Sequence, residues 1–321
     1  MLSGFFADKP PHRKFFIVIS VVLFCTIVLT VAGSVVVDLL YGVNMMDPNA
    51  LSDLENPVVL SAMKMLQLLS TGIGMFLLPS LILAFLFSRR PTNYLHISRK
   101  PAFLMIILAI AIMFAAVPLI NLMLVWNQDM NFPPFLSGIE EWMKASENNA
   151  TRITEALLNM KSGNELFYNL LIIAVLPALG EEFLFRGILM KLFNEITNNI
   201  HAAIIITAVI FSAIHMQFYG FVPRMMLGIL FGYLYYWTGN LWVPVIAHFV
   251  NNGAAVVFAY FASQNELPFN QDTIGTTSDD LMLIIASFIL VSGILFLFWK
   301  NRTNFYNLEK ERDDAVSSVT N

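Results

Sequence analysis

The chain alternates long apolar stretches with shorter polar segments over nearly its whole length. Eight apolar stretches lie near the roughly 20 residues that a helix needs to cross a bilayer. They cover residues 15–37, 65–88, 103–126, 166–190, 202–219, 225–237, 242–261 and 281–299. The sixth stretch is short, and it either extends back through Pro223 or crosses a thinned part of the membrane. The pattern predicts an all-α, multi-span transmembrane helix bundle of about eight helices.

The composition places the chain in the same class. Hydrophobic residues make up 57% and charged residues 12%, whereas soluble domains are about 25% charged. Mean hydropathy is +0.69. We therefore expect a multi-pass protein of the cell membrane, with membrane lipids among its partners. The sequence shows no phosphate-binding loop and no nucleic-acid signature, so no nucleic-acid partner is expected. The single cysteine, Cys25, excludes a disulfide within the chain.

Basic residues predict how the bundle is oriented, because cytoplasmic loops carry an excess of lysine and arginine. Most of the 18 basic residues lie in residues 9–14, 89–100 and 300–312. If these segments are cytoplasmic, both the N- and C-termini are cytoplasmic, which fits an even number of crossings. Lys191, next to the predicted end of the fourth helix, then also falls on the cytoplasmic side.

The chain divides into three predicted regions. Residues 1–163 hold the first three helices and an external segment, residues 164–262 hold the candidate chemistry, and residues 263–321 hold the last helix and a polar cytoplasmic tail. The external segment contains an amphipathic stretch that lies on the membrane surface, caps the bundle or gates access to it. Gly228-x-x-x-Gly232 in the sixth helix predicts a close helix–helix contact.

Polar residues inside the apolar stretches are the candidates for function. Charge at the centre of a bilayer costs roughly 2.5–3.5 kcal/mol per residue, so such residues are kept for a reason. Glu182 and Arg186 are four residues apart and can form an ion pair on one helix face. Glu181 lies about 100° round the helix and is left free. The six residues that we expect to form one buried site are Glu181, Glu182, Arg186, His215, His248 and Asn252.

Two chemistries suit these residues. In the first, Glu181 and His215 activate a water molecule while His248 and Asn252 donate hydrogen bonds to a developing oxyanion. In the second, Glu181, His215 and His248 bind a divalent metal such as zinc, although the His-Glu-x-x-His helix of common zinc proteases is absent. Proton-coupled transport also uses intramembrane glutamate and histidine. A purely structural role, as hydrogen bonds between helices, is the remaining alternative.

The order and spacing of these residues carry a resemblance. Glu181-Glu182-x-x-x-Arg186, Phe211-x-x-x-His215 and His248-x-x-x-Asn252 resemble the motifs of the CAAX-processing and bacteriocin-processing (CPBP/Abi) intramembrane protease family. That family includes the CAAX prenyl endopeptidases of the Ras-converting type. The resemblance covers about residues 164–260, so residues 164–262 would form the protease core.

The resemblance implies an intramembrane endopeptidase acting on a membrane-associated protein or peptide. Glu181 and His215 would activate water and His248 and Asn252 would stabilise the oxyanion, supported by Glu182, Arg186 and Phe211. A glutamate mechanism needing no cofactor and a metalloprotease mechanism are both implied. We favour the first, because asparagine is a poor zinc ligand and a good oxyanion donor. A non-proteolytic immunity or scaffold protein of the same family is the alternative.

Overall fold

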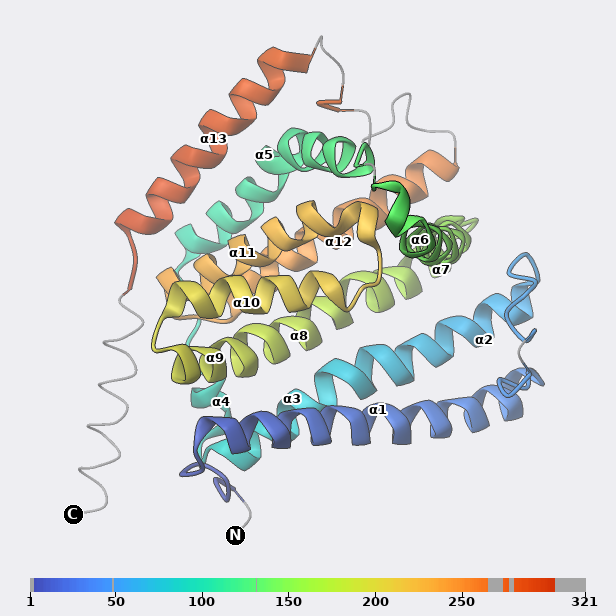
Figure 1. Cartoon of the computed structure of the whole chain (residues 1–321), viewed down its shortest axis with the longest axis horizontal. Coiled ribbons are helices and arrows are strands. Elements are labelled where there is room, and N and C mark those ends of the chain that lie inside the picture. The colour runs from blue at the N-terminus through green and yellow to red at the C-terminus, as the bar shows by residue number, and fades with distance from the viewer. Residues whose placement is uncertain (1–2, 48, 131, 265–273, 277–279, 304–321) are drawn as a thin grey trace.

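The computed structural model describes residues 3–47, 49–130, 132–264, 274–276 and 280–303, and every regular element in these ranges is helical. Most helices run along the long axis of an elongated bundle, with α1 along one edge and α13 along the opposite edge (Figure 1). The main elements are α1 (Pro11–Tyr41), α2 (Pro57–Gln67), η1 (Leu68–Leu77), α3 (Leu78–Phe87), α4 (Pro91–Tyr94), α5 (Phe103–Gln128), η2 (Pro134–Leu136), α6 (Ser137–Leu158), α7 (Gly163–Asn169), η3 (Leu170–Val175), α8 (Leu176–Glu182), η4 (Phe183–Leu189), α9 (Met190–Thr197), α10 (Ile200–Ala213), η5 (Phe218–Gly220), α11 (Phe221–Thr238), α12 (Trp242–Ser263) and α13 (Leu281–Lys300).

Five of these helices are long and apolar enough to cross a membrane, namely α1, the continuous α2–η1–α3, α5, α12 and α13. The continuous helix α7–α9, the shorter α10 and α11 complete the eight stretches expected from the sequence. The prediction of an all-helical, multi-pass membrane protein is confirmed.

The connections between these eight stretches alternate between the two ends of the bundle, as eight successive crossings require. Contacts at each end join connections that are distant in sequence. At one end they link Lys14 to Glu195, Leu241 to His96 and Thr303 to Trp237; at the other they link Asn127 to Phe218, Arg152 to Ser52 and Ser263 to Met160. The first end carries the predicted cytoplasmic segments. Which side of a membrane it faces stays a prediction.

Several predicted boundaries shift in the structure. The fifth stretch ends at Ala213 rather than at residue 219, and the sixth begins at Phe221, so it does extend back through Pro223. The fourth continues to Thr197. Lys191 therefore lies within this helix rather than after its end, and the side of the membrane that it faces stays a prediction. The lysine is buried because its ammonium group donates to the Tyr94 carbonyl and lies over the Tyr94 ring.

The amphipathic segment, which is predicted to be external, forms α6 and caps one end of the bundle. Ser146 donates to the carbonyl of Met216, and Glu147 accepts from the backbone N–H of Tyr219 at 3.2 Å. Further along α6, Arg152 donates to the carbonyls of Leu51 and Ser52. The helix is thus attached to two separate connections. Most of the segment between α12 and α13, and the predicted tail beyond residue 303, lie outside the described residues.

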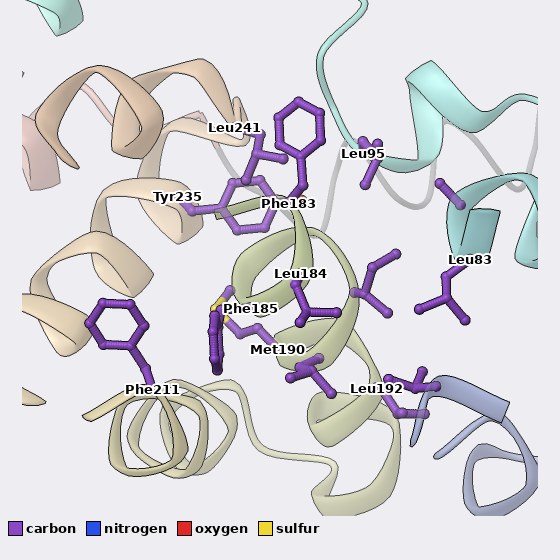
Figure 2. Close-up of a cluster of buried hydrophobic side chains, with 14 of the residues drawn as sticks. Leu83, Leu95, Phe183, Leu184, Phe185, Met190, Leu192, Phe211, Tyr235 and Leu241 are labelled. Atoms are coloured by element: carbon purple, nitrogen blue, oxygen red, sulfur yellow. The ribbon is translucent and has the colours of Figure 1, made fainter. Parts of the chain in front are cut away.

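A large hydrophobic core surrounds η4, where all seven residues are buried. Figure 2 shows Phe183, Leu184 and Phe185 pointing in different directions from this segment into neighbouring helices. A helix that is apolar all round must be enclosed by protein or lipid, and here it is enclosed by protein. This core fixes the segment that directly follows Glu181 and Glu182.

Small residues let the helices around this core approach closely. A Cβ atom added at Gly180 would lie 2.8 Å from the Cβ of Phe76, so the backbone before Glu181 is pressed against the α2–η1–α3 helix. On α11, a Cβ atom added at Gly228 would lie 3.0 Å from Ala208 of α10, and one added at Gly232 would lie 2.8 Å from Ile204 of α10. The predicted close contact of the sixth helix is confirmed.

Candidate active site

The first motif lies where α8 passes into the π-helical segment η4. π-Helical turns inside a longer helix are common at functional sites, because they change the direction of the side chains that follow. Glu181 and Glu182 are the last two residues of α8, and both are buried, at 6% and 0% exposure. Two adjacent carboxylates are therefore held in the interior of the bundle.

Arg186 neutralises Glu182, as its spacing predicted. Its Nη1 lies 2.7 Å from Oε1 of Glu182, and the two side chains are 1% and 0% exposed. Its Nη2 donates to the Gly228 carbonyl at 2.9 Å. The rings of Phe211 and Phe231 lie 5.0 and 5.4 Å from the guanidinium carbon, within the range of cation–π attraction. The predicted ion pair is confirmed, and it also joins the first motif to α11.

His248 of the third motif is held by the same carboxylate oxygen. Its Nδ1 lies 2.8 Å from Oε1 of Glu182, and its ring stacks on Phe231 with 5.2 Å between centroids. Because a carboxylate only accepts, Nδ1 carries the proton in this bond. The second ring nitrogen, Nε2, is therefore the one available for chemistry.

Two polar side chains lie near that nitrogen. Oε2 of Glu181 lies 3.9 Å from Nε2 of His248, and Nδ2 of Asn252 lies 3.2 Å from it. The Asn252 amide also donates to the Ile173 carbonyl at 3.0 Å, which fixes its orientation. Glu181 makes no hydrogen bond with any residue that the structure describes. A carboxylate, an imidazole nitrogen and an amide thus converge, and the carboxylate is free to hold a water molecule.

His215 of the second motif stands slightly apart from this cluster. It follows the end of α10 and is partly buried, and its Nδ1 donates to the Phe211 carbonyl at 2.7 Å. The Phe211 ring contacts both imidazoles, with centroid distances of 5.1 Å to His215 and 6.1 Å to His248. Phe211 therefore connects His215 to the other site residues. Within the described ranges, no hydrogen bond or ion pair joins His215 to Glu181.

The predicted metal ligands do not form one set. Catalytic zinc sites use three protein ligands and a water molecule. Across the part of the chain that is described, no three histidine, cysteine or acidic side chains are grouped so as to hold a metal ion. Glu181 and His248 are neighbours, whereas His215 is linked to His248 only through ring contacts that both make with Phe211.

Some site residues could not be found from the sequence. The Phe231 ring stacks on His248 and lies over Arg186. In the sequence, nothing distinguishes Phe231 from the other apolar residues of its membrane helix. The carbonyls of Ile173 and Gly228 accept from Asn252 and Arg186. Backbone acceptors leave no mark on a sequence. The small-residue pattern at Gly228 was the one available signal, and it pointed to the right helix face.

Comparison with known proteins gives this cluster a family context. The family profile described as "Type II CAAX prenyl endopeptidase Rce1-like" matches residues 163–254, the stretch that carries all three motifs. The membrane-embedded CAAX protease MroQ of Staphylococcus aureus is 36% identical over 92 residues, which are 27% of this chain and 37% of MroQ. YpbD of Bacillus subtilis, an uncharacterized protein, is 33% identical over 86 residues, 26% of this chain and 41% of YpbD.

These matches confirm the resemblance for the segment that holds the site. This chain spans less than half the length of both relatives. No solved structure matches it.

Proposed function

We propose that this chain is an intramembrane endopeptidase, because residues 163–254 match the Rce1-like family of type II CAAX prenyl endopeptidases. Its substrate would be a membrane-associated protein or peptide. The observation that best supports the proposal is the convergence of Glu181, His248 Nε2 and Asn252 in the buried interior of a membrane protein.

In the proposed mechanism Glu181 is the general base. Its carboxylate takes a proton from water as the water oxygen adds to the scissile carbonyl carbon. The carbonyl oxygen becomes an oxyanion, which accepts a hydrogen bond from the Asn252 amide and from Nε2 of His248, whose ring acts in this step as the imidazolium with a proton on each nitrogen. When the tetrahedral intermediate collapses, the C–N bond breaks and Glu181 returns its proton to the departing amine. The products are a carboxylic acid and an amine, and the site regains its starting state.

The other motif residues have supporting roles in this proposal. Glu182 fixes the ring of His248 through Nδ1, and Arg186 neutralises Glu182. His215, whose ring contacts Phe211, would hold the attacking water together with Glu181. Its ring contact with Phe211, which also touches His248, supports that position.

The test uses membranes from cells that express the wild type or the Glu181→Gln variant. New peptide termini are mapped by mass spectrometry, and hits are repeated with purified protein in liposomes. We expect cleavage products that depend on Glu181. The matched control is Glu155→Gln, which makes the same change at an exposed position on α6. If folded Glu181→Gln protein still cleaves, Glu181 is not the general base. If the variant does not cleave but keeps the cellular function of the wild type, the protein acts as a scaffold.

A further inference from the structure

Arg224, in the first turn of α11, is a cation that the proposed mechanism does not use. It is partly buried, and two of its N–H groups donate to Gln217, at 3.3 Å to the carbonyl and 2.7 Å to the side-chain oxygen. Among the described residues, no carboxylate lies within ion-pair distance of it. Its hydrogen bonds to described residues come from Nη1 and Nη2, and none comes from Nε. Arginine carries five N–H donors, so this guanidinium has donors to spare.

The guanidinium is held in a fixed position. Gln217 binds it from the loop before α11, and Gly220 lies directly beneath it, since a Cβ atom there would stand 3.3 Å from Nη2. A free surface arginine has no such support. A planar guanidinium that is fixed in place and keeps free donors matches the two oxygens of a carboxylate.

This cation lies beside the proposed reaction centre. Gly228, which binds Arg186 through its carbonyl, is one helical turn further along α11, or about 6 Å. Arg224 is close enough to Glu181 and His215 for their charges to interact, and on its other side it interacts with Glu147 of α6. The guanidinium therefore stands between the catalytic cluster and the end of the bundle that α6 caps.

We propose, resting on the peptidase function above, that Arg224 binds a carboxylate of the substrate on one side of the scissile bond. The carboxylate is either the C-terminus of the substrate or an aspartate or glutamate side chain near the cut. Arg224 would then determine specificity, because it selects peptides that carry a negative charge at a set distance from the cleaved bond. An exposed arginine would be screened by water, whereas this one is partly desolvated and discriminates more strongly.

The test uses one apolar, quenched-fluorescent peptide with a single acidic residue that the wild type cleaves in liposomes in a Glu181-dependent way. It is made in three forms: with the acidic residue and a free C-terminus, with an amidated C-terminus, and with the acidic residue changed to its amide. We expect the wild type to prefer forms that keep the recognised carboxylate. Arg224→Gln should raise KM for those forms by roughly ten- to a hundredfold, the value of a charged hydrogen bond, and abolish the preference. Arg224→Lys should restore part of it.

Arg152→Gln is the matched control, because Arg152 also binds only carbonyls but lies on exposed α6. It should keep the wild-type preference. If Arg224 only stabilises the loop, Arg224→Gln should instead lower Tm, or lower kcat equally for all three peptides. Either outcome, with the peptide preference unchanged, overturns the proposal. If no peptide is cleaved, the peptidase function fails. Equilibrium binding of the same peptides, measured by fluorescence anisotropy, then decides the inference, and equal affinity of wild type and Arg224→Gln for all forms refutes it.

Discussion

Nδ1 of His248 lies 2.8 Å from Oε1 of Glu182, the oxygen that also accepts from Arg186. One oxygen atom thus holds donors from α12 and from η4, while the second oxygen, Oε2, is buried without a partner among the described residues. This arrangement orients the imidazole and makes the site depend on a single ion pair. Four predictions follow from it and from its surroundings.

Arg186→Ala should destabilise the whole bundle. The change leaves the fully buried Glu182 without its counterion, and breaking a buried pair costs about 3–5 kcal/mol. The measurement is the thermal unfolding midpoint in detergent. Lys144→Ala is the control, because it breaks a pair of the same i, i+4 spacing that is exposed on α6. The control should unfold like the wild type, since exposed pairs contribute little. Equal midpoints for both variants would contradict the prediction.

Asn252→Ala should lower kcat much more than it changes substrate binding. An oxyanion donor acts mainly in the transition state, and its loss reduces kcat by roughly 10²–10³-fold. The Asn252 amide also contacts Nε2 of His248, so part of the loss comes from a less ordered imidazole. Kinetics and metal analysis of both proteins form the test. A stoichiometric metal ion in the wild type that is absent from the variant would show that the site is a metal site.

Cysteine labelling should show that the loop before α5 is cytoplasmic and α6 external. Ser98 and Asn149 are both exposed, so Ser98→Cys and Asn149→Cys form a matched pair in a Cys25→Ser background. An impermeant thiol reagent applied to intact cells should label the second and not the first. Leu95 is buried and would be a poor labelling site. The reverse labelling pattern would invert the predicted topology.

Gly180→Ala should lower both stability and turnover. The added methyl group would lie 2.8 Å from Phe76 Cβ and 3.0 Å from the Leu77 backbone nitrogen, so a backbone must shift. Overpacking of this kind costs about 1–3 kcal/mol, and the shift would move the adjacent Glu181. Gly293→Ala, on α13 with open space around it, is the control. Unchanged turnover in Gly180→Ala would show that the helix contact does not position Glu181.

Much of the fold could be predicted because membrane helices leave a strong local signal. The lengths of the apolar stretches were enough to predict the helix bundle, and the i, i+4 spacing of Glu182 and Arg186 was enough to predict the buried ion pair. The basic segments predict the orientation of the bundle. Contacts across helices were not predictable in this way. Spacing along the chain does not show that His248 binds Glu182, or that the Phe211 ring contacts both imidazoles.

The end of the fourth helix was predicted too early, at residue 190 instead of Thr197, for a related reason. A lysine after an apolar run reads as the start of a loop, because burial of an ammonium group is normally costly. Here the Tyr94 carbonyl and ring accept it, and those groups come from a segment nearly a hundred residues earlier. A tertiary contact offset a local preference that is usually decisive.

The shared oxygen of Glu182 also has a consequence for a genetic screen that selects loss of this protein's function. Alleles at Glu182 or Arg186 remove a contact that holds helices together, so cells should degrade the misfolded chain and show little of it. Alleles at Glu181, whose carboxylate bonds to no described residue, should leave normal amounts of an inactive protein. Substitutions at the adjacent residues Glu181 and Glu182 would thus both abolish function, the first by inactivating the protein and the second by removing it. Only a measurement of protein abundance in the membrane would distinguish them.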